Sequence, residues 1–378
     1  MNDRKFSRDE NRTQNFISRR DFLKLAAITA GLIASGCKPA WLEQTKTAVP
    51  APSMNTKYVV ALAQAESYGR KVVKQKVQAL VEEAGGLAGV CNPGDKAALK
   101  VNLTGGLNFN PSKGFSATES YVTHPEIVRA LGELLIDAGV KELYIVEALY
   151  DQGSVISWGY EQMAKELGAS IIDLNTPSPY KDFVNVPVGP DWFIYETFLL
   201  NPILQDVDVF ISIAKMKCHY NCGITLAMKN LVGLVPVSKY RLSDDHWWRS
   251  ALHGLENETK TRLPRVILDL NRVRPIDFAL IDGIMTAEGG ESPRGSFHPV
   301  QPGVLAAGSN AVAVDAVVTA VMGFDPLAIP PTPPFLRADN YLSLASELGM
   351  GTNHLEAIQV VGASMEEVET SFNPALEM

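Results

Sequence analysis

The apolar run over residues 207–214 constrains the fold more than any other feature of the sequence. A strand that is buried on both faces has this composition, and such strands occur in parallel sheets that are covered by helices. Similar runs alternate with segments of helical periodicity along the chain. We therefore predict an α/β fold, a mainly parallel sheet with helices on both faces. The strands expected to share this sheet are residues 58–63, 96–101, 142–147, 207–213, 276–281 and 303–307.

The first 37 residues have the pattern of an export signal. Arg19 and Arg20 precede a short apolar run over residues 25–34, and small residues then lead to Cys37. Paired arginines, a short apolar region and small residues before a cleavage point are typical of the twin-arginine pathway. The run is too short to span a bilayer, which takes about 20 apolar residues. We expect residues 1–37 to be a signal peptide that engages the twin-arginine translocation machinery.

Residues 34–37 resemble a lipobox, in which the cysteine becomes the lipid-modified first residue, although Ala34 stands where a larger aliphatic residue is usual. The resemblance implies a lipid anchor on Cys37, with plain cleavage as the alternative. Residues 38–56 are rich in Pro, Ala and Thr and are expected to form a flexible tether to one large domain over residues 57–378. The expected location is the periplasm or the outer side of the cytoplasmic membrane.

Charge and cysteine content exclude some partners and cofactors. Residues 1–37 hold seven basic and four acidic residues, so their removal changes the net charge from −8 to −11. No basic tail or patch remains, and nucleic acid is not an expected partner. The three remaining cysteines, Cys91, Cys218 and Cys222, form no C-x-x-C pair. An iron–sulfur cluster is therefore not expected.

Basic side chains gather directly after the apolar run at residues 207–214. Lys215, Lys217, His219 and Lys229 follow it, and His246 comes later. Ligands of α/β proteins bind beyond the carboxyl ends of the strands. Imidazole binds metals and transfers protons near neutral pH, and a partly buried lysine can act as a base or nucleophile or bind an anion. We expect a site for a divalent metal or an oxyanion; the alternative is a solvated turn whose lysines face water.

Other predicted strand ends supply further candidate site residues. Lys100 and Asn102 close one strand and Glu288 follows another, so these residues, with Lys215 and Lys217, are expected to bind substrate. Lys100, Lys215 and Asp282 should lie near one edge of the sheet, because each closes a strand.

Two local helix predictions also bear on the site. Thr123 is expected to be the N-cap of a helix that begins near His124, which is either catalytic or a solvated first-turn residue. A helix that started after Cys222 would place Lys229 about two turns along it.

The order of these motifs resembles the bacterial and archaeal family known as domain of unknown function 362, over nearly all of residues 57–365. The resemblance rests on motifs that recur at strand ends: Lys100-Val101-Asn102, Thr123-His124-Pro125, residues 215–233 with His246, Asp282-Gly283 with Glu288-Gly289, and Val314-Asp315-Ala316. It implies a fold and a site more than a reaction. Many members carry added ferredoxin cysteines, and this chain has none, so cluster-based electron transfer is not implied.

A fainter resemblance connects the order His219, Lys229, His246 with the nickel-pincer lactate racemases. There the lysine holds the cofactor covalently, and the histidines serve the metal and proton transfer. The resemblance implies Lys229, His219 and His246 as catalytic residues, with His219 and His246 also as metal ligands. His124 is a further catalytic candidate, from another part of the predicted site. Here Ala227-Met228 replaces the Gly-Gly that precedes that lysine, which puts the covalent cofactor in doubt.

Two functional classes follow from these observations. The first is an exported, membrane-anchored enzyme that depends on a metal or cofactor, isomerase- or racemase-like or associated with redox chemistry, and acts on a small anionic metabolite. The second is a periplasmic protein that binds a ligand or cofactor without chemistry. The sequence identifies neither the substrate nor the oligomeric state.

Overall fold

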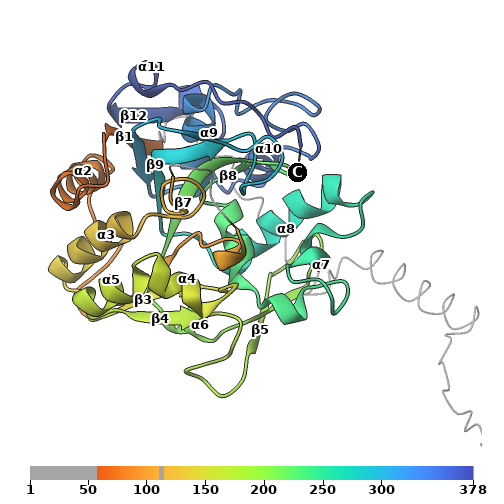
Figure 1. The fold of residues 1–378 in the computed structure, drawn as a ribbon, viewed down its shortest axis with the longest axis horizontal. Helices are drawn as coiled ribbons and strands as arrows, with labels where there is room; N and C mark the ends of the chain where they lie inside the picture. The colour runs from red at the N-terminus through yellow and green to blue at the C-terminus, as the bar shows by residue number, and fades with distance from the viewer. Residues whose placement is uncertain (1–57, 110–114, 378) are drawn as a thin grey trace, which may run out of the picture. The chain divides into compact units, whose positions relative to one another are not determined.

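The computed structural model describes residues 58–109 and 115–377 (Figure 1). The predicted signal peptide, the tether and Cys37 lie outside these residues. Within the described ranges, no helix has the length and apolar character needed to cross a bilayer.

The described residues form one ten-stranded sheet, in the order β12-β1-β11-β9-β7-β2-β3-β4, with β8 paired to β7 and β10 to β9. Seven of the eight strands along this path point the same way, because β11 alone is antiparallel to both of its neighbours. The predicted α/β class and its mainly parallel sheet are confirmed. The strands are β1 (Tyr58–Gln64), β2 (Lys96–Lys100), β3 (Glu142–Glu147), β4 (Ser170–Asp173), β7 (Val209–His219), β8 (Gly223–Thr225), β9 (Phe278–Glu288), β10 (His298–Val300), β11 (Val304–Gly308) and β12 (Ile358–Gly362).

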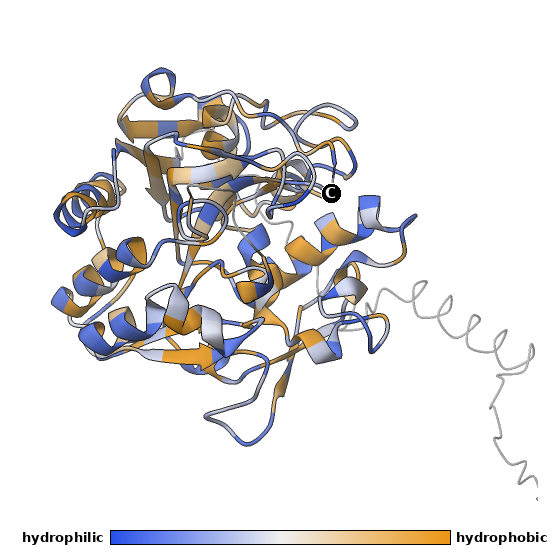
Figure 2. Cartoon of the chain, in the orientation of Figure 1, coloured by the Kyte–Doolittle hydropathy of each residue, from blue (hydrophilic) through white to orange (hydrophobic). Residues whose placement is uncertain are grey.

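Helices cover both faces of the sheet (Figure 1). One face packs against α2 (Arg70–Glu83), α3 (Pro125–Asp137) and α5 (Tyr160–Leu167), and the other packs against α8 (Thr259–Val273), α9 (Ala311–Val321) and α10 (Tyr341–Glu347). In α2, the buried residues Val73, Val77, Leu80 and Val81 form the single stripe of an amphipathic helix. Figure 2 shows the same contrast between largely hydrophobic strands and helices with a hydrophilic outer side.

Shorter elements complete the domain. They are α4 (Gln152–Ser157), α6 (Ile203–Asp206), α7 (Ser250–His253), α11 (Met365–Val368), the 3-10 helices η2 (Gly106–Asn108), η3 (Lys229–Leu234), η4 (Val237–Lys239) and η5 (Leu355–Ala357), and a separate hairpin of β5 (Val184–Pro187) and β6 (Thr197–Leu200). Gly159, which adopts a positive φ of 77°, separates α4 from α5.

Two central strands run further than the apolar pattern predicts. β7 continues through Lys215 and Lys217 to His219, because it stays paired with β9 past a bulge and gains β8 as an antiparallel neighbour. Gly223 has φ 84° and begins β8, so the helix expected after Cys222 is wrong. Lys229 instead begins η3. Lys215 and Lys217, which the sequence places after the apolar run, therefore lie in a buried strand and not in a loop.

Candidate functional site

A cavity of about 250 Å³ lies beyond the carboxyl ends of four parallel strands. Its lining includes Asn102 after β2, Glu147 at the end of β3, His219 at the end of β7 and Glu291 after β9. Lys229, Asn221 and His253 also line it. Its outer wall is aromatic and is formed by Phe109, Tyr150, Trp247 and Trp248. The place is the one at which α/β folds bind ligands.

Lys229 is the basic residue best placed to meet a ligand in this cavity. Its side chain belongs to a residue that is only 9% exposed, and no hydrogen-bond or ion-pair partner for its ammonium exists within the described residues. The backbone before it is fixed, because the Asp315 carboxylate accepts hydrogen bonds from the N–H groups of Ala227 (2.8 Å) and Met228 (3.0 Å). The Lys229 ammonium opens into the cavity, so a ligand with a negative charge could supply the counter-ion that the described residues do not.

Two imidazoles share the cavity with Lys229. The rings of His219 and His253 lie 6.4 Å apart between centroids, and both residues are at least nine-tenths buried. Burial, and then the charge of Lys229, lowers the pKa of His253 to about 3, and the same two causes bring the pKa of His219 well below its usual value. Both rings are therefore neutral at neutral pH.

A buried ion pair lies against the cavity. Lys100 donates to Glu147 (3.0 Å), to the Val101 carbonyl and to Asn230 Oδ1 (3.2 Å), and burial lowers the pKa of Lys100 to about 8 despite the Glu147 charge. Gly233 leaves room for this pair, because a Cβ there would lie 2.6 Å from Lys100 Nζ. Glu147 also accepts the N–H groups of Leu103 and Ala148, so its charge is compensated.

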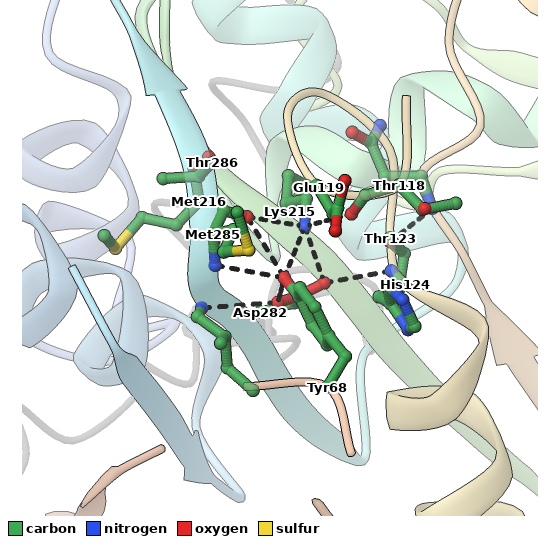
Figure 3. A network of polar contacts seen from close by, with 12 residues as sticks. Tyr68, Thr118, Glu119, Thr123, His124, Lys215, Met216, Asp282, Met285 and Thr286 are labelled. Atoms are coloured by element: carbon green, nitrogen blue, oxygen red, sulfur yellow. Dashed lines mark hydrogen bonds and ion pairs between the residues drawn. The ribbon is translucent and has the colours of Figure 1, made fainter. Parts of the chain in front are cut away.

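Lys215 is buried in a different cluster, which Figure 3 shows. Its ammonium donates to Asp282 (2.8 Å), to the Tyr68 hydroxyl (2.9 Å) and to the carbonyls of Thr118 and Met285 (2.8 Å each). An ammonium has three protons, so this group has no hydrogen-bonding capacity left. Lys215 does not line the cavity.

The expected meeting of Lys100, Lys215 and Asp282 at one edge occurs only in part. Lys215 pairs with Asp282, and all three strands are parallel, so the residues lie toward the same end of the sheet. However, Lys100 is in register with Ser212, three residues from Lys215, and successive side chains of a strand alternate between faces. Lys100 and Lys215 therefore point to opposite faces.

Four further candidates do not line the cavity. Lys217 donates to the carbonyls of Tyr121 (2.6 Å) and Glu291 (3.1 Å) and so connects two loops. Glu288 accepts both the backbone and side-chain N–H groups of Asn373. His246 contacts Ser250 through Nδ1 (2.6 Å). The fourth is His124.

The expected N-cap, Thr123, is wrong by one residue. It is the N-cap of α3, because its Nδ1 accepts from Glu126 N–H, whereas Thr123 accepts from Asn102 N–H and donates to the Ile213 carbonyl. The His124 ring stacks on Tyr68 at 3.7 Å, and burial lowers its pKa to about 4.

Several residues of the cavity are not predicted from the sequence. His253 has no motif around it, and Asn221 stands beside His219 and Cys222, whose side chains are more reactive. Glu291 and Arg294 belong to a Gly-rich loop after a predicted strand, and this loop was the available signal. Within residues 58–109 and 115–377, no three His, Cys, Asp or Glu side chains are grouped as metal ligands, and the second imidazole beside His219 is His253.

Comparison with known proteins gives a family and distant structural likenesses. The family described as "Domain of unknown function (DUF362)" matches residues 98–320, more than half of the chain. The "Thylakoid-associated protein sll1697" of Synechocystis sp. is 27% identical over 314 residues, which cover 82% of this chain and 88% of that protein.

Two solved structures are more distant. A Thermotoga maritima protein has 13% identity and a TM-score of 0.35, over 63% of this chain and 55% of that one. The lactate racemase apoprotein of Thermoanaerobacterium thermosaccharolyticum has 11% identity and a TM-score of 0.36, over 72% of this chain and 58% of that one. The chain thus spans little more than half the length of either structure, and likeness at this level carries no functional argument.

Proposed function

The chain belongs to the family Domain of unknown function (DUF362), and we propose that it binds a small anionic metabolite in the cavity around Lys229 and acts on it through a neutral imidazole. The observation that carries the proposal is the Lys229 ammonium, which belongs to a residue only 9% exposed, lines the cavity and has no partner in the described part of the chain. A ligand with a carboxylate or phosphate group would complete the missing ion pair.

The charges around the cavity support an anion. Three cationic residues line it, Lys229, Arg249 and Arg294, against two carboxylates. One of these carboxylates, Glu147, is already paired with Lys100. The cavity is therefore locally positive although the whole chain carries a net charge of −8. Its volume of about 250 Å³ limits the ligand to a small molecule.

His219 gives the site a neutral hydrogen-bond donor. Its imidazole is buried and neutral, so it can polarise an oxygen of the bound anion, as neutral imidazoles do in isomerases. The proposed reaction class is therefore an isomerisation or racemisation of a small carboxylate or phosphate ester, in which the Glu291 carboxylate of the cavity lining takes the proton from carbon and His219 stabilises the charge that develops on oxygen.

Calorimetric titration of the protein with acetate and with inorganic phosphate tests the binding step. We expect at least one of these anions to bind, with a loss of tenfold or more in Lys229→Met and no loss in the exposed control Lys239→Met. Equal affinity in the wild type and in Lys229→Met would contradict the proposal.

A binding protein without chemistry is the second candidate, because the aromatic wall and the unpartnered cation would serve a carrier equally well. Incorporation of solvent deuterium into a bound hydroxy acid, followed by mass spectrometry, separates the two. Exchange that disappears in His219→Gln supports the enzyme, and tight binding without exchange supports the carrier.

We also propose that the protein is exported by the twin-arginine pathway and anchored through Cys37. The sequence pattern at Arg19 and Arg20 supports export, and the description of the Synechocystis relative as thylakoid-associated agrees with a membrane-associated protein. A single acyl chain binds a membrane only marginally, so stable anchoring needs more than one. Cys37→Ala should move the protein from the membrane fraction to the soluble periplasmic fraction, and unchanged membrane association would contradict the anchor.

A further inference from the structure

Asn221 contacts both imidazoles of the cavity. It lies in the turn between β7 and β8, and its backbone N–H donates to Nδ1 of His219 at 3.1 Å. Its side-chain amide nitrogen lies 3.4 Å from Nδ1 of His253. All three residues line the cavity.

These contacts determine which nitrogen of each ring carries the proton. A neutral imidazole has one N–H donor and one acceptor nitrogen, and an amide N–H can only donate. Nδ1 of His219 is therefore an acceptor, which puts its proton on Nε2, and the same holds for His253 with the amide nitrogen of Asn221 turned toward its ring. The carboxylate of Glu291 lies nearby, with its Oε1 4.0 Å from Nε2 of His219.

The same contacts bear on metal binding. A metal ligand must offer a lone pair, and in both rings the lone pair of Nδ1 already accepts a hydrogen bond while Nε2 is protonated. What the two rings offer a ligand is therefore two N–H donors, beside the Lys229 ammonium. Donors of this kind bind carboxylate and phosphate oxygens.

We infer that Asn221 fixes His219 and His253 as Nε2–H donors, so that the cavity presents only donors from these rings and Lys229 and selects an oxyanion over a metal ion. The inference rests on the proposed anion-binding function and adds the residue that determines its selectivity. Asn221 acts here as a positioning residue, through the two rings.

The direct test is the protonation state of the two rings in the full-length protein, labelled with ¹⁵N. Long-range ¹⁵N–¹H spectra distinguish Nε2–H from Nδ1–H imidazoles, and His219→Gln and His253→Gln assign the signals. Both rings should be in the Nε2–H form in the absence of any ligand. The Nδ1–H form in either ring of the wild type would overturn the inference.

A variant pair tests the consequence for selectivity. Asn221→Asp replaces the amide donor with an acceptor, so His253 should switch to the Nδ1–H form and leave Nε2 free to bind a metal. We expect its affinity for inorganic phosphate to fall about tenfold or more and its affinity for Zn²⁺ to rise relative to wild type. Asn185→Asp makes the same change of charge at an exposed site on β5 and should change neither affinity.

The outcomes separate this inference from the proposed function. If Zn²⁺ binds the wild type in competition with phosphate, or if Asn221→Asp leaves both affinities unchanged, the inference is overturned while anion binding stands. If neither acetate nor phosphate binds the wild type, the proposed function fails, and the oxyanion selectivity inferred here fails with it.

Discussion

Lys215, within β7, and Lys229, at the start of η3, have opposite surroundings. Lys215 is fully buried, and its ammonium contacts four oxygens in the cluster shown in Figure 3. Lys229 is nearly as buried and faces a cavity without a partner among the described residues. The Lys215 ammonium uses all of its hydrogen-bonding capacity within the protein, whereas the Lys229 ammonium can still bind a ligand.

The difference indicates which cluster is structural. The Lys215 cluster joins β7, β9, the segment before α2 and the start of α3, because Tyr68 donates to Asp282 Oδ1 and His124 N–H donates to Asp282 Oδ2. Removing one member of such a pair leaves an uncompensated buried charge, which costs far more than the pair contributes. Removing Lys229 leaves no such charge behind. Substitutions in the two regions should therefore differ in kind.

The largest effect is expected from Lys215→Met. The substitution strands the Asp282 carboxylate, which is fully buried, and should lower the free energy of unfolding by about 3–5 kcal/mol. Urea denaturation measures it. The double variant Lys215→Met/Asp282→Leu should recover most of the loss, and a single variant within about 1 kcal/mol of the wild type would remove the structural interpretation of this cluster.

Gly233→Ala should have the next largest effect. Its Cβ would meet Lys100 Nζ at 2.6 Å and also the Glu147 carboxylate, so the ion pair must shift. Overpacking of this kind costs about 1–3 kcal/mol, measurable by the same denaturation. Gly89→Ala is the matched control, because its Cβ would meet nothing within 4 Å. Equal stability of the two variants would show that the ion pair adapts freely.

The pH dependence of stability should have the same sign in both regions. The folded-state pKa values of His124, about 4, and His253, about 3, lie below the usual 6.5 of histidine. Their contribution to the free energy of unfolding is therefore fully present above about pH 6.5. It is lost as the pH falls toward the folded-state pKa values, by at most about 1.4 kcal/mol per pH unit for each group. His253→Gln should flatten this acid loss in denaturation at pH 4.5 to 7, and the exposed control His354→Gln should not. A steeper loss in His253→Gln would contradict the assignment.

The smallest effect on stability is expected from Lys229→Met. The substitution removes a cation for which residues 58–109 and 115–377 supply no partner, so the free energy of unfolding should change by about 1 kcal/mol or less, or rise. Phosphate at saturating concentration should raise the melting temperature of the wild type and leave that of Lys229→Met unchanged. A loss of stability as large as that of Lys215→Met would mean that the two lysines are equivalent and that the comparison fails.

The α/β architecture follows from the sequence, because apolar runs and helical periodicity are local patterns that burial imposes on each element. His219 and Lys229 are ten residues apart in the chain, so their assignment to one candidate site also needed no tertiary contact. Its predictions of export and of the Cys37 anchor remain predictions, because residues 1–57 lie outside the described structure.

Which of the basic residues have partners depends on contacts between distant parts of the chain. Lys215 finds Tyr68 and Asp282, which lie 147 and 67 residues away, and no local pattern encodes such distant contacts. β7 and β9 extend past their apolar runs, so Lys215 and Lys217 lie in a buried strand and not in a loop. Because side chains alternate along a strand, Lys215 and Lys100 point to opposite faces of the sheet. The same reason explains why His253, and not His246, lies beside His219. Its ring contacts Asn221 in the turn between β7 and β8, and long-range packing rather than spacing along the chain determines which imidazoles meet.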